Sequence, residues 1–362
     1  MKLTFVNFGM DVCGGNRVLF EVANGLIRKG HDVGFVALQS QNWFPLLAPV
    51  KQCRDPQELA LSVPESDVVV ATWCMTAHLV DALKGRRGIP AYYCQHYEPL
   101  FFFNPEEQAA ARVTYDLPLN LIVNSPWLAK ELKTKHNRDS AVVYPGVDLK
   151  LFKQSPGAAK VKRDTEKARQ DCLKALRKKI EAQPSTVGDF GDLPPFKILA
   201  FASQQYFKGF YDTLLPAVQW VAARVPLELH LYGNAALPQN MRLKVVPHGC
   251  VKDEQLAELY NSCDLYVNGS HVESSPLPQL EAMACGTLVL CTEFGTEHFG
   301  TGIQRVPPLQ PRTFAAKILN LLGVPDLREQ MIRRSLVDVQ EFTWEKTVDS
   351  AEKFFLSLLG KT

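Results

Sequence analysis

Short apolar runs alternate with stretches of helical periodicity along the first half of the chain. Residues 3–7 form an apolar run typical of a buried strand, and the apolar positions that follow fall on one helical face that ends at Gly30. Strands that alternate with helices predict a parallel, doubly wound sheet. Further strand-like runs occupy 33–38, 67–71, 91–94, 119–123 and 141–144, with helical patterns near 76–83, 105–115 and 126–136.

The second half of the chain repeats this alternation, so we predict a second Rossmann-like domain of the same α/β class. A last amphipathic helix is predicted from residue 344, and the two domains are expected to face a cleft. Strands are predicted at 197–202, 227–232, 243–246, 264–268 and 288–291, and helices near 211–224, 253–262, 278–285, 311–322 and 326–341.

A compositional break lies between the two halves, at residues 153–195. The 362 residues predict two domains, and we place them at 1–152 and 196–343 on either side of this charged, Pro- and Gly-rich linker. Between 160 and 181 the linker carries nine basic residues against four acidic ones. This charge favours a solvated helix, with a peripheral contact to a membrane surface or an anionic acceptor as the alternative.

Overall composition excludes several classes of protein. The chain is 46% hydrophobic and 22% charged, which is ordinary for a globular protein and unlike disordered, collagenous or coiled-coil sequences. Its net charge is 40 − 38 = +2, so no nucleic-acid partner is expected. The nine cysteines are an odd number without a Cys-x-x-Cys pair, which indicates reduced thiols and neither disulfides nor a zinc site. No apolar stretch suits a signal peptide or a membrane span, so we expect a cytoplasmic protein.

A glycine loop separates the first predicted strand from the first helix. Gly14 and Gly15 stand at the start of that helix, where backbone N–H groups and the helix dipole favour an anion. The spacing matches neither the dinucleotide fingerprint nor the P-loop. The alternative is a tight turn whose glycines adopt positive φ.

Two carboxylates frame the start of a helix in the second half. Pro278 suits the first helical position and Gly286 the position after the last, so the preceding loop would present Glu273 at the helix's positive end. Together with Glu281, this carboxylate could hold hydroxyls at two points of one ligand. The structural alternative is that Glu281 complements the helix dipole and Glu273 is only solvated.

A third candidate is Lys208, which follows the first strand of the second half in the segment Ser-Gln-Gln-Tyr-Phe-Lys-Gly. A lysine at the mouth of a helix suits a phosphate group, and a plain surface lysine is the alternative. No Asp-x-Asp pair occurs in the chain, so we expect no metal in the site.

Taken in order, these segments resemble a family 4 retaining glycosyltransferase with the GT-B fold, the glycogen-synthase-like group. The residues that carry the resemblance are the glycine pair with 23–33, the segments 144–152, 246–264 and 288–295, and the Glu-x7-Glu motif with the Ala-Met-Ala-Cys-Gly that follows. No single motif decides the resemblance, but their order does.

The resemblance implies roles for residues on the donor side. Gly14 and Gly15 would offer N–H groups to the donor diphosphate, and Lys208 would neutralise that diphosphate as it departs. The family usually has an Arg five positions before this lysine, where this chain has Ser203, with Gln204 beside it.

The same resemblance assigns the sugar and the nucleotide. Glu273 would hold sugar hydroxyls and Glu281 the ribose hydroxyls, while the backbone near Val251 would contact the base. The backbone of Ser275, Leu277 and Pro278 would cradle sugar and phosphate, with Ser-Ser-Pro standing where the family has Gly-Phe-Gly.

On the acceptor side, the segment Gln-His-Tyr-Glu-Pro resembles the loop that often carries a histidine near the sugar. His96 is the first candidate and Glu98 the second, with a structural histidine as the alternative. Phe101, Phe102 and Phe103 follow, either as an apolar patch facing the acceptor or as ordinary packing.

The function that the resemblance implies is transfer of a sugar from a nucleotide-diphosphate sugar to a hydroxyl of a glycan, lipid-linked or small-molecule acceptor. Retention of configuration, front-side attack and independence of metals and cofactors are expected, and helix 344–362 would pack on the first domain. A GT-B nucleotide-sugar epimerase and a non-catalytic nucleotide-sugar-binding protein stay open, and the second is motivated by Ser203. Location at the inner face of a membrane also stays open.

Overall fold

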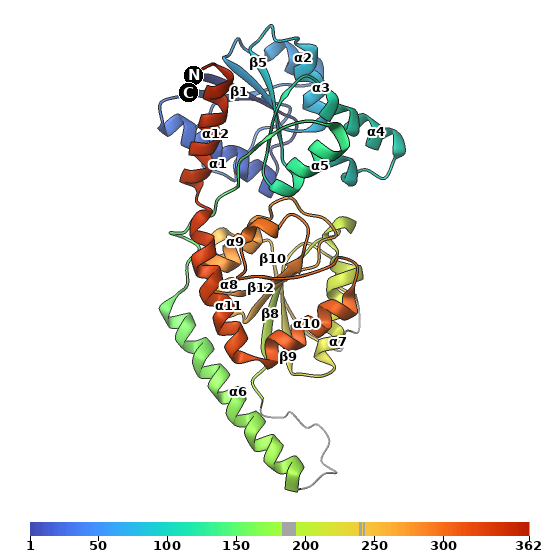
Figure 1. The fold of residues 1–362 in the computed structure, drawn as a ribbon, viewed down its shortest axis with the longest axis vertical. Coiled ribbons are helices and arrows are strands. Elements are labelled where there is room, and N and C mark those ends of the chain that lie inside the picture. The colour runs from blue at the N-terminus through green and yellow to red at the C-terminus, as the bar shows by residue number, and fades with distance from the viewer. Residues whose placement is uncertain (183–192, 239–240, 242, 362) are drawn as a thin grey trace. The chain divides into compact units, whose positions relative to one another are not determined.

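The computed structural model describes residues 1–182, 193–238, 241 and 243–361 (Figure 1). The chain divides into two compact units. Unit 1 comprises Met1–Gly146, Glu273–Leu277 and Glu341–Thr362, and unit 2 comprises Val147–Val272 and Pro278–Gln340. Unit 2 therefore includes residues 153–182, which the sequence analysis places in a linker.

The sheet of unit 1 has seven parallel strands in the order β3-β2-β1-β4-β5-β6-β7. Leu3 of the central β1 pairs with Val33 of β2 and with Val68 of β4. The order of strand addition reverses between β1 and β4, and such sheets bind ligands outside the carboxyl ends of the strands at this point. The strands span Lys2–Asn7 (β1), Asp32–Ala37 (β2), Val50–Gln52 (β3), Val68–Ala71 (β4), Ile89–Cys94 (β5), Asn120–Val123 (β6) and Ala141–Val142 (β7).

The helices of unit 1 begin at recognisable caps. Asp55, Asn104 and Ser125 each accept a hydrogen bond from a backbone N–H of the helix they cap, and each precedes a proline at the first helical turn. The sequence analysis missed α2 and β3. Strand β3 has only three residues and lacks an apolar run. The helices are α1 (Gly14–Arg28), α2 (Pro56–Ser62), α3 (Cys74–Ala82), α4 (Pro105–Val113), α5 (Pro126–His136) and α12 (Trp344–Leu358), with 3₁₀ turns η1 (Glu98–Phe101) and η2 (Thr114–Asp116).

Helix α12 packs on α1 within unit 1. A Cβ on Gly25 would lie 2.2 Å from Cγ2 of Val348, so glycine here lets the two helices approach closely. At the end of α1, Lys29 pairs with Asp349 at 2.6 Å and also with Glu352. The C-terminal helix therefore completes one face of the first sheet, where Phe355 joins the core formed by β1 and β2.

Unit 2 contains a six-stranded parallel sheet in the order β10-β9-β8-β11-β12-β13. Its order reverses between β8 and β11, where Leu265 pairs with Ile198. The strands span Phe196–Ala202 (β8), Leu227–Gly233 (β9), Lys244–Gly249 (β10), Leu265–Asn268 (β11), Leu288–Thr292 (β12) and Gln304–Val306 (β13). The helices are α6 (Pro156–Ala182), α7 (Leu215–Ala222), α8 (Asp253–Ser262), α9 (Leu277–Ala284), α10 (Pro311–Gly323) and α11 (Pro325–Asp338), with short turns η3 (Tyr206–Lys208), η4 (Phe210–Leu214), η5 (Glu297–Phe299) and η6 (Val339–Glu341).

Two cations, the buried Arg169 and the half-buried Lys162, attach α6 to the body of unit 2. Both Arg169 Nη atoms bind Asp264, at 3.0 Å and 2.8 Å, and Lys162 Nζ donates to the Tyr260 carbonyl and the Thr287 hydroxyl at 3.3 Å. Burial lowers the pKa of Lys162. Part of the basic excess of this segment is therefore used to hold the helix in place.

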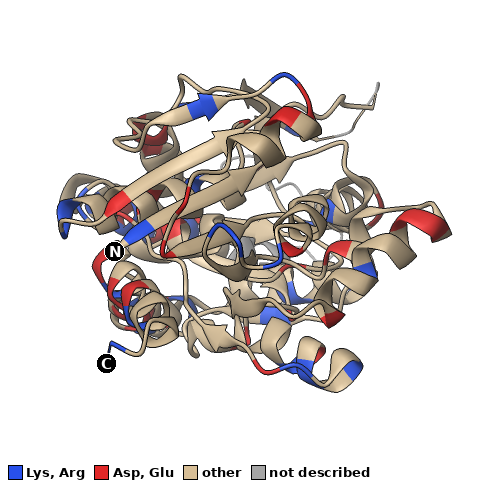
Figure 2. Cartoon of the chain, turned by 90° about the horizontal axis from the view of Figure 1, so that it is seen from above, with Lys and Arg blue, Asp and Glu red and all other residues tan. Residues whose placement is uncertain are grey.

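Basic and acidic residues are interspersed over the whole fold (Figure 2), in agreement with the net charge of +2. Among the described residues, no helix is both long enough and apolar enough to cross a membrane.

Candidate functional site

Asn16, in the first turn of α1, organises the glycine loop of unit 1 (residues 9–15). Its Nδ2 donates to the carbonyls of Gly9, at 3.2 Å, and Asp11, at 2.8 Å. Its Oδ1 accepts from Nδ2 of Asn7 at the end of β1, and Thr72 after β4 donates to Asn7 Oδ1 at 3.1 Å. A buried polar network at the switch point thus fixes this loop, and the sequence analysis did not find Asn16.

The structure itself does not require glycine at positions 14 and 15. Neither residue has φ in the left-handed region, so a turn with positive φ does not explain them. A Cβ added to Gly14 or Gly15 would meet its nearest neighbours, in Leu277 and Gln95, at 3.7 Å and 3.5 Å, which are ordinary contacts. Neither strain nor crowding among the described residues therefore accounts for the pair.

His96 lies just after β5, in an aromatic setting. Its ring centroid is 4.3 Å from that of Phe101 and 6.2 Å from that of Trp127, and its Nδ1 is 3.3 Å from the Tyr97 carbonyl. Phe101 also stacks on Trp73 at 5.8 Å. Phe101 therefore packs within this loop, whereas Phe103 is 83% exposed.

Glu98, two residues further, is buried at the base of the same loop. Its Oε2 accepts from the Cys74 N–H at 2.6 Å, at the start of α3. Burial raises the pKa of the Glu98 carboxyl to about 7, and the nearby Tyr92 and Cys74 partly offset that rise. The carboxyl thus links the loop that carries His96 to the first residue of α3.

The loop that contains Glu273 belongs to unit 1 in its segment 273–277. The Ser274 hydroxyl donates to Asn124 Oδ1 and lies 2.9 Å from the hydroxyl of Ser125, which caps α5. Glu273 and Ser275 are both buried, and Leu277 joins the core of unit 1. Serine at position 274 therefore has a definite hydrogen-bonding reason, which the sequence analysis did not supply.

In unit 2, Lys208 ends η3, a single turn after β8. Ser203 is buried, and its Oγ accepts from the Gln205 N–H at 3.2 Å, while Gln204 is exposed. The Nζ of the half-buried Lys208 lies 5.5 Å from the centroid of the Phe207 ring. Ser203 thus stabilises the turn before Lys208.

Glu281 lies in α9 against a group of buried tyrosines in unit 2. Tyr260 donates to Glu281 Oε2 at 3.1 Å, and its hydroxyl lies 3.4 Å from that of Tyr232. The Tyr266 hydroxyl is also 3.4 Å from that of Tyr232. Glu281 is therefore held by a side chain from α8, and Tyr260 is a second residue that sequence reasoning missed.

The boundaries of α9 agree closely with the prediction. Pro278 is the second residue of the helix instead of the first, and Gly286 follows its end with φ of +64°.

Val251 lies in the turn between β10 and α8. Just before it, His248 Nε2 is 3.1 Å from His230 Nδ1, and burial lowers the pKa of both imidazoles.

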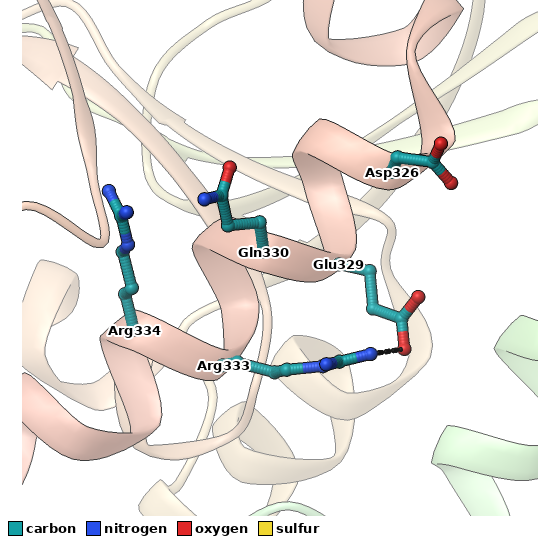
Figure 3. Close-up of a pocket in the computed structure, with 5 residues that line it drawn as sticks. All are labelled: Asp326, Glu329, Gln330, Arg333 and Arg334. Atoms are coloured by element: carbon teal, nitrogen blue, oxygen red, sulfur yellow. Dashed lines mark hydrogen bonds and ion pairs between the residues drawn. The ribbon is translucent and has the colours of Figure 1, made fainter.

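A surface hollow of about 390 Å³ lies elsewhere, along α11 (Figure 3). Its lining residues come from that one helix, among them Glu329 and Arg333, which form an ion pair at 2.5 Å. It contains none of the predicted site residues. Within the described ranges, no group of three or more His, Cys, Asp or Glu side chains is placed to hold a metal ion.

Solved structures define the class of fold. HepE from Anabaena, in complex with UDP and glucose, has a TM-score of 0.75 at 17% identity, covering 99% of this chain and 100% of that chain. WaaG, described as a glycosyltransferase involved in lipopolysaccharide biosynthesis, has a TM-score of 0.63 at 14% identity, covering 98% and 99%. The two parallel-sheet domains are those of the GT-B fold, which confirms the predicted fold class.

Sequence comparisons then match part of the chain to a family. Residues 196–323 match the family described as "Glycosyl transferases group 1". RfbC, an O-antigen biosynthesis protein of Myxococcus xanthus, is 25% identical over 85% of this chain and 22% of its own length. A D-inositol 3-phosphate glycosyltransferase of Segniliparus rotundus is 34% identical over 58% of this chain and 44% of its own. The chain thus spans less than half the length of these two relatives.

Proposed function

We propose that this chain is a family 4-like retaining glycosyltransferase that transfers a sugar from a nucleotide-diphosphate sugar to a hydroxyl acceptor. The observation that carries the proposal is the pair Gly14 and Gly15 at the start of α1, since neither strain nor crowding within the protein requires a glycine there. Backbone N–H groups at a helix start bind phosphate groups well. The group 1 family match over 196–323 supports the same chemistry.

In this proposal the nucleotide contacts unit 2. The Glu281 carboxylate, which Tyr260 orients, accepts hydrogen bonds from the ribose hydroxyls, and the backbone at Val251 contacts the base. HepE binds UDP and glucose according to its description, so UDP-glucose is the first donor to test. Glu273 and the backbone of Ser275, Leu277 and Pro278 contact the sugar and phosphate.

Catalysis in this proposal is stabilisation of the charge that builds on the leaving diphosphate. Fixed donors and cations at that charge lower the barrier, because their interaction strengthens as the glycosidic bond breaks. Lys208 and the N–H groups of Gly14 and Gly15 supply them. The departing phosphate accepts the acceptor's proton on the same face of the sugar, which gives retention. No cofactor and no metal are assigned, in line with the absence of Asp-x-Asp from the sequence.

His96 and the loop held by Glu98 form the proposed acceptor side. The description of RfbC as an O-antigen biosynthesis protein favours a glycan or lipid-linked acceptor of polysaccharide synthesis. We propose a cytoplasmic location, with contact to the inner face of a membrane if the acceptor is lipid-linked.

A thermal-shift screen of nucleoside diphosphates and their sugars tests the proposal. A bound ligand raises the unfolding midpoint according to its concentration and affinity. We expect one nucleotide to stabilise the wild type and Glu281→Ala to lose most of that shift. Glu329→Ala, on the surface of α11, is the control and should keep it. If no nucleotide stabilises the wild type, the proposal fails.

The stereochemistry needs a separate measurement, NMR assignment of the product anomer. Retention is expected, and clean inversion would refute the mechanism. Incubation with the donor alone distinguishes the epimerase alternative, because only an epimerase would return an isomerised sugar nucleotide without an acceptor. Loss of activity in EDTA would contradict metal independence.

A further inference from the structure

Two segments of unit 2 are fastened together at its topological switch point. The first is the lysine turn (residues 206–209), which follows β8, and the second is the β11 loop (residues 269–272), which follows the neighbouring strand. The N–H of His271 donates to the Phe207 carbonyl at 2.8 Å. Gly209 has φ of +60°, and a Cβ there would lie 1.9 Å from the Gly269 carbonyl oxygen. The two backbones are therefore in direct contact.

A side-chain pair joins the same two segments. His271 Nε2 lies 2.9 Å from Asp212 Oδ1, and the two side chains are 11% and 34% exposed. A carboxylate only accepts hydrogen bonds, so the imidazole donates through Nε2. Asp212 stands in η4, a single π-helical turn that directly follows the lysine turn. Such turns are rare and occur often at functional sites.

The ring of His271 has a second contact in the lysine turn. Its centroid lies 4.8 Å from that of Tyr206, edge to face. The β11 loop is itself fixed, because Thr292 donates to the Ser270 carbonyl at 2.5 Å. The imidazole thus connects a fixed loop with the start of the lysine turn and with the π-helical turn that follows it.

We propose that His271 and Asp212 form a clasp that positions Lys208 on the donor diphosphate. The inference rests on the proposed function of the site. Lys208 is the only cation in the segment 203–209, so no other positive charge of this segment can replace Lys208 when the lysine turn is displaced. Since Glu273 follows His271 by two residues, the clasp also fixes the chain just before the predicted sugar ligand. His271 and Asp212 are both positioning residues that act through Lys208.

The experiment compares His271→Ala and His271→Gln in the wild type and in Lys208→Ala. Alanine removes the bond to Asp212, whereas glutamine carries an amide N–H that can donate to the same carboxylate. We expect His271→Ala to lower kcat/KM for UDP-glucose by about ten- to hundredfold, because small displacements of a charged group have effects of this size. His271→Gln should recover most of the loss. Glu329→Gln, which breaks an exposed ion pair on α11, is the control.

Comparison of His271→Ala in the wild type and in Lys208→Ala separates a positioning role of His271 from a general effect on stability. If His271 acts through Lys208, His271→Ala should add little to the loss that Lys208→Ala already causes. An equal loss in both backgrounds, or no loss in the wild-type background, would overturn the clasp. Hydrogen exchange of the amides of 206–214 gives a readout without any ligand, and it should quicken in His271→Ala. A wild type that binds no nucleotide would instead refute the proposed function itself.

Discussion

Gly15 in unit 1 and Gly209 in unit 2 stand beside predicted donor-binding residues for different physical reasons. Gly209 has a left-handed φ, and its missing Cβ leaves room for the Gly269 carbonyl oxygen, so the fold of unit 2 requires a glycine there. Gly15 meets neither condition, and a Cβ at that position would make only ordinary contacts with Gln95. A sequence shows both as a glycine near a helix start, and only the structure separates them.

The difference teaches how each unit holds its own predicted site residues. In unit 2, charged residues are held by neighbouring side chains, as Glu281 is held by Tyr260. In unit 1, a buried asparagine holds the loop by its carbonyls and leaves the glycine pair without steric demands. Substitutions in unit 1 and in unit 2 should therefore have different effects.

The largest effect is expected for Gly209→Ala. The strained φ and the collision with the Gly269 carbonyl should destabilise the protein by about 3 kcal/mol and displace Lys208, so that activity is lost as well. Thermal unfolding and donor turnover measure the two losses. Gly30→Ala isolates the strain, because Gly30 has φ of +87° without a neighbour within 4 Å, and about 1 kcal/mol is expected. Equal stability of the two variants would contradict the role of the carbonyl contact.

The next effect is a pH-dependent one, for Glu98→Gln in unit 1. Burial raises the pKa of Glu98 from 4.5 to about 7, so the folded protein keeps a proton that the unfolded chain releases. The wild type therefore loses stability as the pH rises through this range, by about 3 kcal/mol in all. Glutamine does not titrate and can still accept from the Cys74 N–H.

Urea unfolding at pH 5 and pH 8 checks this expectation. The stability of Glu98→Gln relative to the wild type should increase between the two pH values. Glu107→Gln, which removes an exposed carboxyl from α4, controls for the loss of a surface charge. A difference from the wild type that does not change with pH would show that Glu98 is ionised throughout.

Gly15→Ala should separate binding from folding. Alanine favours a helix more than glycine does, so the unfolding midpoint should stay or rise slightly. The new methyl group would stand where the diphosphate approaches, and we expect kcat/KM for the donor to fall about tenfold. Gly323→Ala is the matched control, since Gly323 has no neighbour within 4 Å and lies at the end of α10. Full activity of Gly15→Ala would remove the central support for the diphosphate site.

Much of the fold was predictable because buried parallel strands form continuous apolar runs. The predicted runs became β1, β2 and β4 to β12, and Pro278 and Gly286 mark the ends of α9 to within two residues. The missed strands β3 and β13 have only three residues each, which is too short for a pattern.

The sequence motifs predict candidate ligand-binding residues, but they do not predict the side chains that hold those residues in place. Asn16 and Tyr260 act through partners that are distant in sequence, such as Asn7 and Glu281, and spacing along the chain does not show such contacts. Ser274 likewise has its reason in Asn124, 150 residues away. Supporting polar residues of this kind have no motif, because the fold decides their partners.

The smallest effect tests one of these supporting contacts, through Tyr260→Phe. The substitution removes the hydroxyl that donates to Glu281 Oε2 at 3.1 Å and keeps the buried ring. Loss of one such bond costs about 1 kcal/mol, so the nucleotide should bind roughly fivefold more weakly. Tyr93→Phe is the control, because the described part of the chain offers its buried hydroxyl no hydrogen-bond partner. Calorimetric titration with UDP should show weaker binding for Tyr260→Phe alone, and equal affinities would mean that Glu281 is held without Tyr260.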